Sequence, residues 1–202
     1  MTRTGSIALL FAAAGAAAGV AVATAAGGGG HSAAPTASHC GGQLWRLKTL
    51  SDRLRGRVQL GPQTTTIAAI RERPGPGHPP RRRATQFQLH VWEVPAQVTS
   101  YKLDPTGAVR LVLFDDPAYV NAVIPSPACL PATTRHRAEI VAAWRAFMTK
   151  CGKPTRDWQS LGAILFVRGV GFWSEKRGPR GEAPNGAELY PVTGIRIVAG
   201  CR

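Results

Sequence analysis

Acidic side chains are scarce in this 202-residue chain, which carries 11 Asp and Glu against 25 Lys and Arg. The resulting formal charge of +14 attracts polyanions without choosing among them, so nucleic acid, anionic lipid and acidic cell-envelope polymers all qualify as partners. The composition also allows an interpretation without binding. High Arg together with high Ala, Gly and Pro is typical of a GC-rich genome, which raises Arg throughout a proteome.

Signatures of several enzyme and metal-site classes are also missing. No Cys-x-x-Cys pair occurs, which disfavours a four-cysteine zinc site, and no Gly-x-Ser-x-Gly motif occurs, which excludes the usual nucleophile elbow of an α/β-hydrolase. His90 and His136 lack any such partner motif and are interpreted as surface or core-edge histidines. We therefore predict no metal and no cofactor, and these absences favour a protein that is not an enzyme.

The N-terminus has the three parts of a secretory signal peptide. Arg3 supplies a positive start, an apolar run follows over residues 7–22, and Ala23-Thr24-Ala25 is a cleavage motif. We predict a signal peptide over 1–26, a flexible Gly/Ala/Ser tether over 27–39, and a secreted, extracytoplasmic protein with no membrane span after cleavage. A retained membrane anchor is the alternative, although the run is near the lower length limit for crossing a bilayer.

All four cysteines, Cys40, Cys129, Cys151 and Cys201, lie beyond the predicted signal peptide. An even number of cysteines in an exported chain predicts disulfides, and four cysteines allow three connectivities. We favour Cys40–Cys201, which would join the two ends of the domain, and Cys129–Cys151, which would bracket one helix.

The remaining chain, residues 40–202, is predicted to be a single domain. Apolar residues indicate five strands, at Gln86–Leu103, Val109–Leu113, Tyr119–Ile124, Leu161–Trp173 and Glu188–Val198. A stripe with helical spacing predicts a long helix over Thr134–Lys150, capped by Thr133 or Thr134, and a shorter helix with a Thr cap is predicted over Ile67–Arg73.

Two segments between these elements lack regular patterning. Gly61-Pro62 is predicted to break the chain, and 74–84 is predicted to be a Pro/Arg-rich solvated loop. The basic run Arg81-Arg82-Arg83 in this loop is interpreted as solvated charge, with a site for an acidic polymer as the alternative.

The element order β-β-β-α-β-β is typical of an OB-fold-like β-barrel, that is, an oligonucleotide/oligosaccharide-binding type. The apolar parity of the first strand slips between Val91 and Val94, beside Pro95, and a slip of one residue would turn side chains to the other face. A bulge or bend there would restore their burial and would suit a first strand shared by both sheets of a small barrel. The predicted fold class is therefore mainly β, an OB-fold-like barrel with one long and one short helix.

Four sequence motifs resemble a family of uncharacterised bacterial exported proteins: Trp-Arg-Leu-Lys-Thr-Leu-Ser-Asp at 45–52, Ile-Pro-Ser-Pro-Ala-Cys at 124–129, Gly-Val-Gly-Phe-Trp at 169–173 and Ala-Pro-Asn-Gly-Ala-Glu-Leu-Tyr-Pro-Val at 183–192. The resemblance covers most of 45–198 and implies an OB-fold-like domain, but it implies no established activity. The chain departs from the family at Tyr190, where a His is usual, and in the loop after Trp173.

In a barrel of this type, ligands bind on the second and third strands, flanked by the loops between strands one and two and between strands four and five. The candidate ligand-binding residues are Arg110, Phe114, Tyr119, Asn121, Lys176, Arg177 and Arg180. Cations beside flat rings suit single-stranded nucleic acid. The alternative is that the rings belong to the core and that the loop charges are solvated. The nearby Asn185-Gly186 step is interpreted as turn geometry.

A second candidate site consists of the carboxylates Asp115, Asp116 and Glu188, with Arg110 as a phosphate partner, because oxygen ligands suit calcium. We predict a secreted, non-catalytic binding module of unknown ligand, with an anionic polymer (nucleic acid or an envelope polyanion) as the favoured class. The alternatives are a calcium-dependent nuclease-like enzyme on an OB barrel and a structural or protein-interaction module of the cell envelope.

Overall fold

Long β-strands dominate residues 40–201, the part of the chain that the computed structural model describes. The strands in this part are β1 (Gln59–Thr64), β2 (His90–Leu103), β3 (Val109–Asp115), β4 (Ala118–Ile124), β5 (Gln159–Trp173) and β6 (Ala187–Ala199). The α-helices are α1 (Trp45–Lys48), α2 (Ile67–Arg71) and α3 (Arg137–Lys150), and 3-10 turns lie at η1 (Arg55–Arg57), η2 (Gln86–Leu89) and η3 (Pro127–Cys129). The predicted signal peptide and tether, 1–26 and 27–39, lie outside the described residues.

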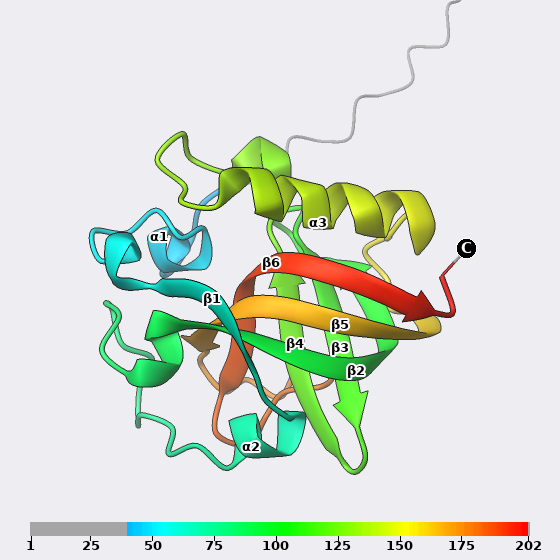
Figure 1. The fold of residues 1–202 in the computed structure, drawn as a ribbon, viewed down its shortest axis with the longest axis horizontal. Helices are drawn as coiled ribbons and strands as arrows, with labels where there is room; N and C mark the ends of the chain where they lie inside the picture. Colours follow the sequence, from blue (N-terminus) through cyan, green and yellow to red (C-terminus); the bar gives the residue numbers. More distant parts are fainter. Residues whose placement is uncertain (1–39, 202) are drawn as a thin grey trace, which may run out of the picture. The chain divides into compact units, whose positions relative to one another are not determined.

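The strands form one sheet that closes on itself (Figure 1). The order is β1-β2-β3-β4-β6-β5, and β5 pairs back onto β2, so that β2 to β6 complete a ring. Neighbouring strands are antiparallel, except that β4 pairs with β6 and β1 with β2 in parallel. The prediction of a mainly β, barrel-like fold is confirmed. Closure removes the free strand edges of the ring, which would otherwise expose unpaired backbone groups.

Strand β2 is bent, but not where the parity slip suggested. Its register with both β3 and β5 shifts between Val98 and Ser100, whereas the ladder to β5 runs without interruption past Pro95. Val91 and Trp92 are both buried, because Trp92 faces the main core and Val91 faces a second apolar cluster on the other side of the sheet. The parity slip therefore reflects burial on both faces, and the predicted bulge beside Pro95 is wrong.

Strand β1 was not predicted, because its sequence reads as a chain break. It contains Gly61 and Pro62, and nearly all of its residues are exposed. A proline lacks the N–H that an interior strand must donate, so it is tolerated only at an edge or a bulge. β1 meets this condition, since it pairs with β2 alone and with an irregular register.

Two helices lie on opposite sides of the barrel and close its core (Figure 1). Ile67 and Ile70 of α2 and Ala143 and Phe147 of α3 belong to one apolar cluster with the strand interiors. The predicted Thr cap of α2 is confirmed, because Thr66 accepts a hydrogen bond from the Ala69 backbone. Within residues 40–201, no helix has the length and apolar character needed to cross a membrane.

Helix α3 begins at Arg137, three residues after its predicted start, and neither predicted threonine caps it. His136 occupies the cap position with a left-handed backbone, φ 59°. Arg135 holds the preceding segment away from the helix, because its guanidinium donates to the carbonyls of Arg55, Gly56 and Val58 at 2.7–3.0 Å.

The disulfide connectivity differs from the predicted one. The bonds are Cys40–Cys129 and Cys151–Cys201, so the pairing of Cys40 with Cys201 and of Cys129 with Cys151 is wrong. Cys151 ends α3 and Cys201 follows β6, which packs along that helix, whereas Cys40 precedes α1 and Cys129 follows β4. Two disulfides are typical of proteins that fold in an oxidising compartment.

The first prediction concerns Cys151–Cys201, which closes a loop of 50 residues. Replacing both cysteines by Ala should lower the free energy of unfolding by about 4 kcal/mol, because the unfolded chain regains the entropy that the bond removed. Urea unfolding of the oxidised proteins measures this difference. Reduced wild type lacks both disulfides, so its stability should match that of the variant once the contribution of Cys40–Cys129 is subtracted. Unchanged stability would mean that the bond does not form.

One arginine of the predicted solvated run is buried in the fold. The Arg83 side chain is 0% exposed and forms an ion pair with Asp52 at 2.9 Å. It also donates to the backbone carbonyls of Gln88 and Leu47, each at 3.0 Å. Burial lowers the pKa of Arg83, and Asp52 opposes that effect. Arg83 thereby connects the Pro/Arg-rich segment to α1, whereas Arg81 and Arg82 are exposed.

The second prediction is that Arg83→Met destabilises the fold by about 3 kcal/mol, because it leaves a buried carboxylate and two carbonyls without their donor. Arg82→Met, the control at the neighbouring exposed position, should change stability by less than about 0.5 kcal/mol. Chemical denaturation of both variants gives the comparison. Equal effects would show that Arg83 is not the anchor.

Candidate functional site

A cavity of about 320 Å³ opens beside α1, between β3, β4 and the loop from Ser174 to Gly186. This volume is at the lower end of the range for small-molecule sites. The polar side chains that line it are Gln43, Lys48, Thr106, Arg110, Asn121, Ser174, Glu175, Arg177, Glu182 and Glu188, and the apolar ones are Leu44, Pro79, Phe172, Pro179 and Ala187.

The sheet brings three of these side chains together from three adjacent strands. Arg110 lies on β3 and Asn121 on β4, and Glu188 lies at the start of β6. In the parallel β4–β6 ladder, Asn121 is the register partner of Glu188. Arg110 Nη1 donates to Glu188 Oε2 at 3.0 Å, across 78 residues of sequence.

Glu188 is a charged side chain in a nearly dry position, since the residue is 3% exposed. Burial acts to lower the pKa of Arg110, but the attraction and hydrogen bond of Glu188 outweigh it and the pKa is raised. The second carboxylate oxygen of Glu188, Oε1, is buried and has no hydrogen-bond partner among the described residues. Asn121 is 2% exposed, and its Oδ1 is likewise buried without a partner in this part of the chain.

Lys48 contributes a half-buried ammonium to the same cavity. Its Nζ lies 5.6 Å from the ring centroids of both Phe172 and Tyr190, within cation–π range. Burial lowers the pKa of Lys48, and the carboxylate of Glu188 opposes this shift. A lysine with a lowered pKa destabilises the folded state while protonated, so its unfavourable contribution decreases as pH rises through its folded-state pKa.

Tyr190 lies on the inner side of the cavity, where its ring contacts Lys48 and Phe172. It is 2% exposed, and burial together with Asp104 and Glu188 raises the pKa of its phenol. The phenol therefore stays neutral.

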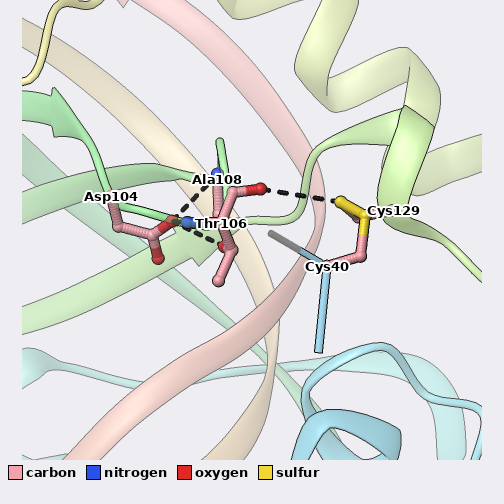
Figure 2. Close-up of a disulfide and its surroundings, with 5 residues drawn as sticks. All are labelled: Cys40, Asp104, Thr106, Ala108 and Cys129. Atoms are coloured by element: carbon pink, nitrogen blue, oxygen red, sulfur yellow. Dashed lines mark hydrogen bonds between the residues drawn. A yellow bond between two sulfur atoms is a disulfide. The ribbon is translucent and has the colours of Figure 1, made fainter. Parts of the chain in front are cut away.

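The Cys40–Cys129 disulfide lies beside Thr106 (Figure 2), and Thr106 lines the cavity. Asp104 Oδ1 accepts hydrogen bonds from the Thr106 backbone and hydroxyl and from the Ala108 backbone, at 2.6–3.1 Å. The Thr106 carbonyl oxygen lies 3.6 Å from Cys129 Sγ, a contact to a disulfide sulfur that carries no proton. Cys40–Cys129 thus places Gly41 and the residues after it, which line the cavity, next to this turn.

The loop over the other side is held by its own side chains. Glu182 accepts from the backbone N–H groups of Arg177 and Gly178. Asn185 donates to the carbonyls of Ile70 and Arg73 at 2.9 and 3.0 Å and accepts from Ala187, which agrees with a structural role for the Asn-Gly step. Gly181 packs so closely that a Cβ there would lie 2.9 Å from Asn121 Oδ1.

The predicted ligand-binding residues separate into three groups: those that line the cavity, those that line a second hollow, and those that line neither. Arg110, Asn121 and Arg177 line the cavity, but Phe114 and Tyr119 pair with each other at 4.6 Å and do not line it. Tyr119 and Arg180 line a different, shallow hollow that also contains Ser100 and Val112. Lys176 is exposed and lines neither.

The predicted carboxylate site does not assemble. Asp115 and Asp116 are exposed at the β3–β4 turn, whereas Glu188 is buried beside Asn121. Asp115 pairs with Ala118, which lies three residues from Asn121 along β4, or about 10 Å at the usual rise of a strand. Among the described residues, no group of three or more His, Cys, Asp or Glu side chains could hold a metal ion.

Lys48 is one of several cavity residues that sequence reasoning missed, with Thr106, Glu175 and Glu182 among the others. It lies in the motif at 45–52, for which no site residue was predicted. A lysine inside a short apolar segment was the available signal, since α1 exposes Arg46 but half-buries Lys48.

No family model matches the sequence, and no curated protein matches it. Among solved structures, the fold is similar to part of a Leishmania major Friedlin protein assigned as an aspartyl-tRNA synthetase, with 15% identity and a TM-score of 0.41. The match covers 68% of this chain and 21% of that protein, so the chain spans about a fifth of its length.

The third prediction concerns the Arg110–Glu188 pair. Arg110→Met alone should lower stability by about 3 kcal/mol, because Glu188 remains buried without its cation. Arg110→Met with Glu188→Met should lose less than the sum of the two single changes, by about 1–3 kcal/mol, since neither charge is then left alone. Four urea unfolding curves complete the double-mutant cycle. Additive effects would contradict a direct interaction.

Proposed function

We propose that this chain is an exported, non-catalytic binding module on an OB-type barrel, and that its ligand occupies the cavity beside Lys48. The strand order from β2 to β6 and the position of α3 between β4 and β5 support the OB type. The disulfides support export, in agreement with the predicted signal peptide.

One observation carries the proposal: two side chains that line the cavity each have a buried oxygen acceptor without a hydrogen-bond partner among the described residues. They are Glu188 Oε1 and Asn121 Oδ1. Buried polar atoms in proteins are nearly always hydrogen-bonded, and each unsatisfied one costs about 1–3 kcal/mol. A ligand that donates to both oxygens would recover this free energy, and so the arrangement suits ligand binding better than it suits stability.

The charges of the cavity favour a small ligand over a polyanion. Its three basic side chains, Lys48, Arg110 and Arg177, are matched by three acidic ones, Glu175, Glu182 and Glu188. The inner acceptors require hydroxyl or amine donors, whereas the Lys48 ammonium makes no hydrogen bond among the described residues and requires an acceptor. A polyhydroxyl ligand with one carboxylate, the chemistry of a sugar acid, satisfies both demands. Phe172 and Leu44 offer apolar contact for its ring.

The fourth prediction is that D-glucuronate binds the oxidised protein more tightly than D-glucose does, as measured by isothermal titration calorimetry. Lys48→Met should reduce the glucuronate affinity at least tenfold, to the level of glucose, because the carboxylate loses its partner. Asn121→Leu should weaken both sugars. Raising the pH through the pKa of Lys48 should weaken glucuronate alone, since the ammonium loses its charge.

Stability separates this function from a structural role. Asn121→Leu removes an acceptor that the fold leaves without a partner among the described residues, and Lys48→Met removes an ammonium whose burial is unfavourable, so neither should lower the unfolding temperature appreciably. Lys150→Met, at an exposed position of α3, is the matched control and should bind like wild type. Loss of stability in both cavity variants, or no saturable binding of either sugar by the wild type, would overturn the proposal.

A further inference from the structure

A second concave surface lies at the junction of α1 and the Pro/Arg-rich segment. This arginine groove has a volume of about 590 Å³. Its lining residues are Gly41, Gly42, Leu44, Trp45, Arg46, Leu47, Asp52, Arg53, Leu54, Arg81 and Arg82. Gly41, Gly42 and Leu44 also border the cavity, so the two surfaces meet at the segment that follows Cys40.

The four arginines of the groove carry uncompensated charge. Arg46, Arg53, Arg81 and Arg82 are exposed, and none of their side chains forms an ion pair or hydrogen bond with residues 40–201. By contrast, Arg110, Arg168 and Arg177 each have a carboxylate partner. Gathering four like charges in one groove is unfavourable unless an anion offsets their repulsion.

The one acidic side chain of the groove does not neutralise them. Asp52 Oδ2 binds the guanidinium of Arg83 at 2.9 Å, and Asp52 Oδ1 accepts the Leu54 backbone N–H at 2.9 Å. Because the Asp52–Arg83 pair is neutral as a unit, the groove keeps the full charge of its four arginines.

The fold places these arginines together by a rigid connection. Arg81 and Arg82 lie about 30 residues after Arg53 in the sequence, and buried Arg83 connects their segment to Leu47 of α1. Because this anchor already orders the segment, the protein loses less conformational entropy when an extended anion binds.

Trp45 adds a half-buried aromatic side chain to the same groove. Arginines that follow a phosphate backbone, beside an aromatic face on which a base can stack, are the elements of single-stranded nucleic-acid binding. We propose that the arginine groove binds single-stranded nucleic acid, independently of the ligand in the cavity. The phosphates contact the four arginines, and one base contacts Trp45.

The fifth prediction uses the oxidised protein and a fluorescent oligothymidylate in anisotropy titrations at several salt concentrations. Replacing the four groove arginines by Gln should reduce the slope of log K against log salt by about 3, since each phosphate contact on a single strand contributes about 0.7. The matched control changes the same number of exposed cations elsewhere, Arg137, Arg145, Lys153 and Arg156, to Gln, and should leave most of the slope intact.

The role of Trp45 needs its own comparison. An abasic oligonucleotide of the same length should bind about tenfold more weakly than the oligothymidylate, and Trp45→Leu should remove this difference. An equal decrease of the salt slope in the groove and control variants would show non-specific attraction to net charge and would overturn the proposal. Equal affinity for the abasic strand or for polyphosphate would overturn the nucleic-acid assignment. Lys48→Met should not affect the oligonucleotide, so failure of the cavity proposal and failure of this one are distinguishable.

Discussion

The parallel pairing of β4 with β6 is the constraint on which the candidate site depends. It inserts β6 between β4 and β5, completes the ring, and sets Glu188 beside Asn121 in register. Only then does Arg110 on β3 reach the Glu188 carboxylate. Closing the barrel in this way buries a charged side chain at its wall, and the hydrogen bond from Arg110 satisfies one of its two oxygens. The other oxygen is buried without a partner among the described residues, on a side chain that lines the cavity. Barrel closure and the polar candidate site are therefore two consequences of one pairing.

The segment after Cys40 forms the boundary between two chemically different surfaces. On one side lies the cavity, in which acidic and basic side chains balance, and on the other lies the arginine groove, in which they do not. Cys40–Cys129 anchors the start of this segment, and Arg83 anchors its α1 portion through the Leu47 carbonyl. The net charge of the chain therefore gives a poor description of either surface, because charge is matched in the cavity and accumulates in the arginine groove.

Patterned segments were predictable, whereas segments whose burial comes from distant neighbours were not. Strands β3 to β6 lie close to their predicted ranges because apolar residues repeat along them. β1 was missed because its Gly-Pro step is compatible only with an edge position. The bulge was misplaced because Val91 is buried by a second cluster that no local pattern reports. Arg83 was interpreted as solvated because its three acceptors come from other segments of the chain.

The sequence by itself determined the mainly β character of the domain, the order of most elements, and the presence of Arg110, Asn121 and Arg177 among the candidate ligand-binding residues. These follow from local periodicity, turn composition and strand order, each of which extends over a few residues. The tertiary structure alone decided the disulfide partners and the position of Lys48 in the cavity. It also separated Asp115 and Asp116 from Glu188 and brought together Arg46, Arg53, Arg81 and Arg82. Each of these depends on the distance between segments far apart in the chain, and that distance is set by barrel closure and by the packing of α1 and α3 rather than by the residues themselves.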